Sequence, residues 1–272
     1  MFFGISLTRP RSRRPGGAVP ETVSVNVDRQ CHVAVVEFRR PPLNYFTSEL
    51  IGKIADAYEA LDEDPECRAL VLAAAGRHFC AGADFHGESA QAFSTAALYE
   101  QGLRLFAARK PVVAAVQGCA IGGGLGLALS ADFRVATPST QFRCSFARLG
   151  IHHGFGMTVT LPAAVGRQNA SLLLYSGGRV TGQEAKAMQL CDLVVVEDEL
   201  RSAAVTLASE IAAAAPLAVG GIRETMRCGL YEQVKEAMAI ENAKQDRCRA
   251  TSDFAEGVRA MHERRIPTFT GV

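Results

Sequence analysis

A triple glycine at residues 122–124 interrupts an apolar stretch that reads GCAIGGGLGLALSAD over residues 118–132. The stretch holds no acid, base or nucleophile before Asp132, so chemistry at the glycines must use the backbone. Glycine lets a backbone approach another group closely, at an entropic cost that calls for a reason. The apolar run Val112–Val116 predicts a strand before the glycines, and a helix is expected after them. Unpaired N–H groups at such a helix N-terminus bind negative charge.

Two phosphate-binding motifs fail at these glycines. The dinucleotide fingerprint G-x-G-x-x-G, started at Gly122, meets Leu127 at its sixth position, and no Gly-Lys-Ser/Thr loop is present. The remaining interpretation is an oxyanion hole, in which backbone N–H groups stabilise charge on a carbonyl oxygen. The segment GRHFCAGADFHG, residues 76–87, offers the second donor, because Gly82 and Ala83 form a small-residue turn after another expected strand.

These residues also carry a family resemblance. The segment FCAGADF and the later KPVVAAVQGCAIGGGLGLALSADFRVAT resemble the crotonase family of enoyl-CoA hydratases and isomerases. The likeness continues through FARLGIHHGFGMTVTLPAAVG, GGRVTGQEAKAMQLCDLVV and EGVRAMHERRIP, and so spans about residues 22–269.

The resemblance implies an α/β fold, a crotonase-like spiral of ββα units with a helical C-terminal trimerisation region. It implies acyl-CoA thioester substrates, with coenzyme A carried by the substrate rather than held as a cofactor, no metal, and a homotrimer or dimer of trimers. The thioester oxygen would bind the N–H groups of Ala83 and Gly123. The expected substrate-binding residues are Arg77, Ala81, Ala83, Asp84, Phe85, His86, Gly122, Gly123, Phe146 and Arg264.

The family's catalytic acids are missing from this chain. Its hydratases use two glutamates, whose positions map onto Gly126 and Phe146, and its dienoyl-CoA isomerases use an aspartate that maps onto Gly154. Between Gln101 and Gln183 the only carboxylate is Asp132, for which we expect a structural role. Hydration should therefore be impaired, by about 10² to 10⁴ in rate for each missing group.

Two adjacent histidines are the candidates for proton transfer. His152 and His153 precede Gly154, and imidazole titrates near neutral pH. Paired histidines also occur in ordinary loops, so a catalytic and a structural role both stand. His86, after the AGADF turn, is expected to touch the CoA or the rim of the pocket.

The order of elements supports a parallel α/β core. Strands are expected at residues 23–27, 33–38, 69–75, 112–116 and 133–136 and near 193–196, with helices over 50–61 and 98–108 and after the triple glycine. Strand, helix, strand implies parallel pairing. A capping box at residues 181–184 and the alanine-rich segment 200–215 predict later helices. We divide the chain into a disordered basic leader (1–20), a core with the CoA and acyl pocket (21–198) and a helical oligomerisation region (199–272).

Composition excludes several function classes. With 272 residues, 48% hydrophobic content and a net charge of +1, the chain indicates one large globular unit with no preference for nucleic acid. No apolar run reaches the roughly 18 residues of a membrane span. Eight scattered cysteines without zinc-ligand spacing favour free thiols and a cytoplasmic location. The expected function is an acyl-CoA enzyme of this family, with a non-catalytic acyl-CoA binding protein or scaffold as the alternative.

Overall fold

The structure is a computed structural model that describes residues 24–83 and 94–272 of the chain. The expected leader, and Asp84, Phe85 and His86 of the expected site, lie outside the described residues.

A six-stranded sheet forms the centre of the fold, in the order β1-β2-β3-β4-β6-β9. Its strands are β1 (Ser24–Gln30), β2 (Val33–Arg39), β3 (Ala69–Ala74), β4 (Val112–Val116), β6 (Phe133–Ala136) and β9 (Leu193–Val194). The first two strands pair antiparallel, and every later pair is parallel. The predicted parallel core is therefore confirmed.

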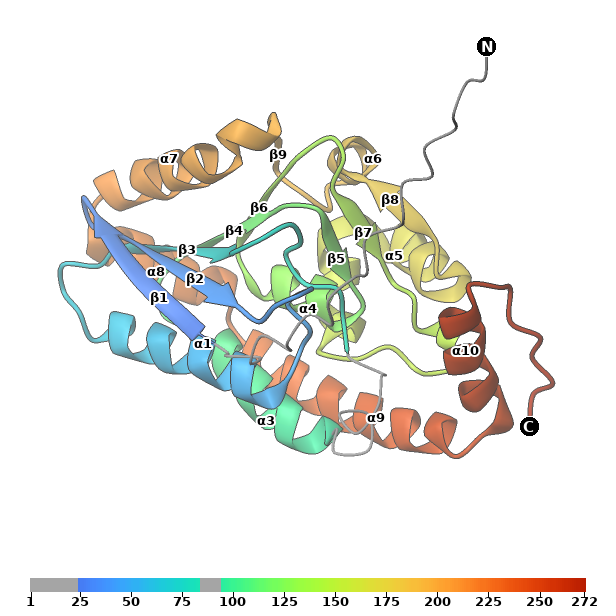
Figure 1. Cartoon of the computed structure of the whole chain (residues 1–272). Helices are drawn as coiled ribbons and strands as arrows, with labels where there is room; N and C mark the ends of the chain where they lie inside the picture. The colour runs from blue at the N-terminus through green and yellow to red at the C-terminus, as the bar shows by residue number, and fades with distance from the viewer. Residues whose placement is uncertain (1–23, 84–93) are drawn as a thin grey trace, which may run out of the picture.

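Helices cover both faces of this sheet, as Figure 1 shows. Side chains alternate along each strand, so one set of β-strand residues packs under α7 (Leu200–Ala213) and the other packs against α1 (Ser48–Asp62) and α3 (Thr95–Phe106). All of β3 and β4 is buried, which explains why these strands are continuous apolar runs. The alanine-rich α7 belongs to the packing of the sheet, although it lies beyond the expected boundary at residue 199.

A second, three-stranded sheet has the order β5-β7-β8 and holds the triple glycine at its edge. Its strands are β5 (Cys119–Ile121), β7 (Gln141–Arg143) and β8 (Arg179–Thr181). Each strand is three residues long, too short to produce the alternation that identifies a strand in a sequence. The sequence analysis therefore missed this sheet.

The remaining helices are α4 (Gly123–Ser130), α5 (Met157–Ser176), α6 (Gly182–Ala187), α8 (Pro216–Met226), α9 (Leu230–Arg249) and α10 (Ser252–Glu263), with two 3-10 turns at Ala147–Leu149 and Glu197–Glu199. N-cap residues in the sequence mark the first residues of several helices. Thr47 caps α1, and the capping box predicted at residues 181–184 is present at α6.

Asp132 has the structural role that the sequence predicts. Its carboxylate accepts hydrogen bonds from the Val112 amide at 2.8 Å and from Arg223 and Arg227 of α8 at 3.0 and 2.8 Å. It thereby ties α8 to the end of β4.

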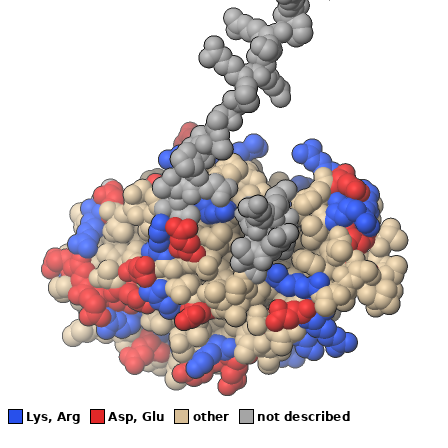
Figure 2. All heavy atoms as spheres, turned by 60° about the horizontal axis from the view of Figure 1, so that its bottom comes forward, with Lys and Arg blue, Asp and Glu red and all other residues tan. Residues whose placement is uncertain are grey.

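The surface carries charges of both signs. On the face shown in Figure 2, Lys and Arg are interspersed with Asp and Glu. Within residues 24–83 and 94–272, no single helix is both long and apolar enough to cross a membrane; only α7 with its preceding turn and α8, taken together across a 107° bend, pass a test of length and composition.

Candidate active site

Two short segments run side by side at the centre of the site. Cys80 forms a parallel bridge with Ala120, and the Ile121 amide donates to the Cys80 carbonyl at 3.0 Å. Ala83 and Gly123 follow this pairing, each three residues further along its own segment. Both residues line one cavity, and the role of their amides as oxyanion donors stays a prediction.

Each glycine of the triple glycine has its own steric reason. Gly122 has φ 54° and ψ −118°, a conformation that side chains rarely adopt. A Cβ added to Gly123 would lie 2.8 Å from the Phe46 ring, and one added to Gly124 would lie 2.5 Å from the Cys80 carbonyl oxygen. The backbone here is in close contact on all sides, as three glycines in a row predict.

The Ala83 and Gly123 amides are available to donate hydrogen bonds to a ligand oxygen. Gly123 begins α4, so its N–H has no carbonyl of a preceding turn to donate to. The Phe46 amide donates a hydrogen bond to the Gly82 carbonyl at 2.9 Å, so this contact does not use the Ala83 amide. Within the described part of the chain, neither the Ala83 nor the Gly123 amide donates a backbone hydrogen bond outside the regular elements.

Ala83 and Gly123 both line a cavity of about 450 Å³. Most of its wall is apolar, from Phe46, Leu98, Ile121, Leu149, Ile151 and Met261 among others. Five arginines line it among the described residues: Arg143, Arg148, Arg249, Arg264 and Arg265. No carboxylate lines it in the same described part of the chain. The cavity therefore suits a long, largely apolar ligand with negative charge.

An aromatic wall lies at Phe146 and beside Gly126, the positions onto which the sequence analysis maps the family glutamates. The ring of Phe146 lies beside the oxyanion amides, because a Cβ built on Gly122 would lie 3.7 Å from its Cζ. A Cβ on Gly126 would lie 2.9 Å from that of Phe155, whose ring packs edge-on against Phe46 at 4.8 Å. Phe155 thus fills the space that a side chain at position 126 would need.

The two candidate histidines lie outside the cavity lining. His152 Nδ1 is 2.8 Å from the His153 carbonyl, and His153 Nε2 is 2.8 Å from Thr158 Oγ1. The rings stack at 4.1 Å, and burial, together with the neighbouring His152, lowers the pKa of His153 to about 4. The structure does not bring these rings to the oxyanion amides, and their role in proton transfer stays a prediction.

A buried carboxylate behind the histidines was not foreseen. Glu241 of α9 is fully buried and accepts hydrogen bonds from the amides of Gly156 and Thr158 at 2.8 and 2.9 Å, at the start of α5. Burial raises the pKa of Glu241, and these hydrogen bonds oppose the rise. Glu241 caps a helix whose own N-cap, Gly156, has no side chain.

The other predicted site residues divide into three groups. Ala81, Ala83, Gly122, Gly123, Phe146 and Arg264 line the cavity. Arg77 lies exposed after β3 and is not among the lining residues. Asp84, Phe85 and His86 lie outside the described residues.

Several polar residues of the wall were missed, among them Thr95, Tyr99, Gln245 and Arg249. They come from α3 and α9, which lie far apart in the chain: Thr95 and Gln245 are separated by 150 residues. A signal exists in α9, where Glu241 and Gln245 continue the buried stripe of Val234, Ala237 and Met238 at helical spacing. Polar residues on a buried stripe indicate partners inside the fold.

Comparisons with known proteins agree with this geometry. The family model described as enoyl-CoA hydratase/isomerase matches residues 28–272. A crotonyl-CoA hydratase of Syntrophomonas wolfei is 33% identical over 90% of this chain and 97% of its own length, and enoyl-CoA hydratase EchA19 of Mycobacterium tuberculosis is 32% identical over 89% and 95%. The crystal structure of an enoyl-CoA hydratase/isomerase from Pseudoalteromonas atlantica superposes with a TM-score of 0.82, at 31% identity over 91% of this chain and all of that chain. The chain belongs to the enoyl-CoA hydratase/isomerase family.

Proposed function

We propose that this protein converts an acyl-CoA thioester through an enolate whose oxygen is held by the amides of Ala83 and Gly123, in a reaction other than hydration. The observation that supports the proposal is that Ala83 and Gly123 line the same cavity, just beyond the paired residues Cys80 and Ala120. Two such donors stabilise developing negative charge, and removing one typically costs about 10² to 10³ in rate. The α4 dipole adds to them.

The surroundings of these amides argue against water activation. Family hydratases carry glutamates at the positions that map onto Gly126 and Phe146. In this chain both places are apolar, because Phe146 occupies one and the Phe155 ring lies next to the other. Without a base for water and an acid for the α-carbon, hydration loses its proton transfers. Isomerisation, decarboxylation, carbon–carbon cleavage and thioester hydrolysis also pass through charge on the thioester oxygen and keep the benefit of the amides.

The rival function is non-catalytic binding of acyl-CoA. The oxyanion amides and the cavity would serve it equally well, and the absence of carboxylates among the described lining residues favours it.

A panel of CoA thioesters separates the two functions. We expect crotonyl-CoA hydration to be about 10² or more slower than that of a family hydratase measured alongside, with faster turnover in at least one of the other reactions. Fast hydration would contradict the proposal. Tight binding with no turnover in any reaction would support the rival.

We also propose that the chain assembles as a homotrimer or dimer of trimers. The support is family membership and the apolar side chains exposed on α8, where Leu217 is 91% and Met226 is 81% exposed. Light scattering at micromolar concentration measures the mass directly, and a monomeric mass would contradict this assembly.

A further inference from the structure

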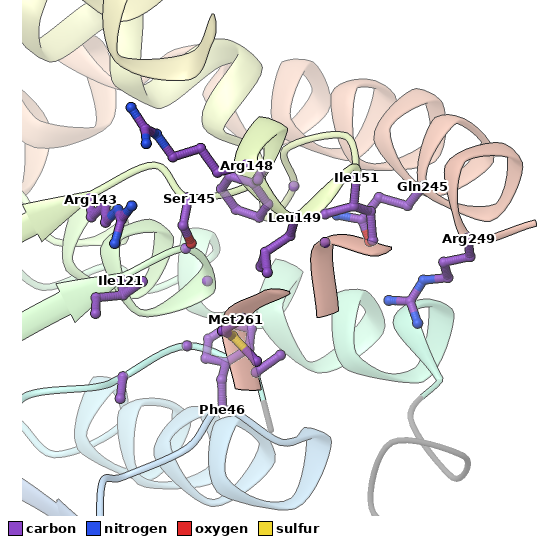
Figure 3. Close-up of a pocket in the computed structure, with 18 of the residues that line it drawn as sticks. Phe46, Ile121, Arg143, Ser145, Arg148, Leu149, Ile151, Gln245, Arg249 and Met261 are labelled. Carbon is purple, nitrogen blue, oxygen red and sulfur yellow. The ribbon is translucent and has the colours of Figure 1, made fainter. Parts of the chain in front are cut away.

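The two ends of the cavity have different chemistry. Figure 3 shows Ile121, beside the oxyanion amides, on one side, Phe46, Leu149 and Met261 in the middle, and Gln245 and Arg249 on the other side. The middle is apolar. A cluster that we name the distal polar cluster, made of Thr95, Tyr99, Gln245 and Arg249, forms the far end.

Hydrogen bonds connect the members of this cluster. Arg249 donates from Nη2 to Thr95 Oγ1 at 3.0 Å, and the Thr95 hydroxyl donates to Gln245 Oε1 at 3.5 Å. A Cβ added to Gly154 would lie 1.8 Å from Tyr99 Oη and 2.5 Å from Gln245 Nε2. The hydroxyl and the amide thus flank one point of the wall, which only a glycine at position 154 leaves open.

The cluster presents hydrogen-bond donors to the cavity. Tyr99 Oη accepts from the Phe155 amide at 3.1 Å, and its own hydrogen has no acceptor in the part of the chain that the structure describes. Gln245 uses one N–H on the His152 carbonyl at 3.0 Å and keeps a second. Thr95, Tyr99 and Gln245 are 6%, 8% and 6% exposed, so water satisfies them poorly. Burial raises the pKa of Tyr99, which keeps its hydroxyl a donor at neutral pH.

A purely hydrocarbon acyl chain does not match this end. It would press a methyl group against the buried Tyr99 hydroxyl and the Gln245 amide, and burying polar groups without partners is costly. Sites built to hydrogen-bond a polar group discriminate strongly against analogues that lack it. A carboxylate has only acceptor oxygens when ionised and matches a guanidinium with neighbouring neutral donors.

We propose that the acyl group of the substrate ends in a carboxylate, which the distal polar cluster binds through Arg249 with Tyr99 and Gln245. This inference rests on the proposed function, since it assumes that the thioester oxygen lies at Ala83 and Gly123. It assigns the substrate class as CoA monothioesters of dicarboxylic acids.

Binding of matched ligands tests the proposal without turnover. Saturated acyl-CoA thioesters of equal length, ending in a methyl or a carboxylate, are titrated into the full-length protein by calorimetry. We expect wild type to bind the carboxylate form at least about 10-fold more tightly at one chain length. Arg249→Met should weaken that form by about 10- to 100-fold and change the methyl form by less than about 3-fold.

Matched variants control for charge and folding. Arg247→Met removes an exposed arginine of the same helix that does not line the cavity, and it should leave both affinities unchanged. Arg249→Lys keeps the charge and should restore part of the preference. If Arg249→Met unfolds, which circular dichroism detects, Tyr99→Phe removes one donor and should still reduce the preference.

Each result has a distinct meaning. Equal binding of methyl and carboxylate forms at every length overturns the inference and leaves the proposed function standing. A preference that survives Arg249→Met and Tyr99→Phe overturns the assignment to this cluster. Failure to bind any acyl-CoA overturns the proposed function, and this inference with it.

Discussion

The two ends of the cavity are built from different parts of the chain. At one end the proposed donors are the backbone amides of Ala83 and Gly123, which follow two short paired segments. At the other end the donors are side chains of α3 and α9 that tertiary packing brings together. A backbone site leaves a local sequence pattern, because glycines are needed wherever the chain comes close, whereas a side-chain site of this kind leaves almost none.

The largest expected effect comes from disturbing the backbone end. Gly123→Ala places a Cβ 2.8 Å from the Phe46 ring, so the segment must shift and the amide must move. We expect turnover to fall by about 10²-fold or more, measured as kcat/KM with the best thioester of the panel. Gly221→Ala, on α8 with open space around the new methyl group, serves as the control.

A second change sharpens this test. Phe46→Leu in the Gly123→Ala background removes the ring that the methyl group meets, and it should recover part of the activity. Wild-type activity in Gly123→Ala itself would mean that the backbone end is not where the reacting oxygen binds.

His152 and His153 line neither end of the cavity. The pH dependence of stability tests whether His153 is held neutral there. The pKa of about 4 for His153 lies below the ordinary value of about 6.5 expected in the unfolded chain. As pH falls through 6.5 the unfolded state binds a proton that the folded state does not, so stability decreases until the folded pKa is reached. We expect wild type to lose about 2 kcal/mol more than His153→Gln between about pH 7 and pH 5.

Urea denaturation at each pH measures this loss. Between about pH 7 and pH 8 the difference between the two proteins should change by less than about 0.2 kcal/mol, since His153 is then largely deprotonated in both the folded and the unfolded state. If the unfolding free energies of the two proteins change in parallel down to pH 5, His153 is not held neutral in the folded state. The same two proteins, assayed for turnover, test the predicted role in proton transfer.

The smallest effects concern the aromatic wall between the two ends. Gly126→Ala gains helix propensity but places a Cβ 2.9 Å from that of Phe155, and we expect a net loss of about 1 to 2 kcal/mol in unfolding free energy. Gly220→Ala, also in a helix but with nothing within 4 Å of the new methyl group, should gain about 0.5 to 1 kcal/mol. Thermal denaturation compares them, and a stabilised Gly126→Ala would mean that Phe155 does not fill this space.

Sequence reasoning predicted the parallel core, which the structure confirms, and it selected Ala83 and Gly123, which line one cavity, because both features leave local patterns. The runs at β3 and β4 are continuous and apolar, and the glycines at 122–124 follow one of them directly. The strands β5, β7 and β8 were missed because three residues give no alternation. The cap that Glu241 provides and the distal polar cluster were missed because they depend on how α9 packs against α3 and α5.

The pairing of Cys80 with Ala120 also allows thioester binding and acyl specificity to evolve separately. Substitution of a side chain at Ala83 changes the volume of the wall but not the identity of its donor, since every residue except proline supplies an amide N–H. Under the proposed function, activation of the thioester is retained while side chains of α3 and α9 vary. New acyl specificities are accessible to such a scaffold through a few helix positions, and Thr95, Gln245 and Arg249 are the ones to randomise in a directed search for them.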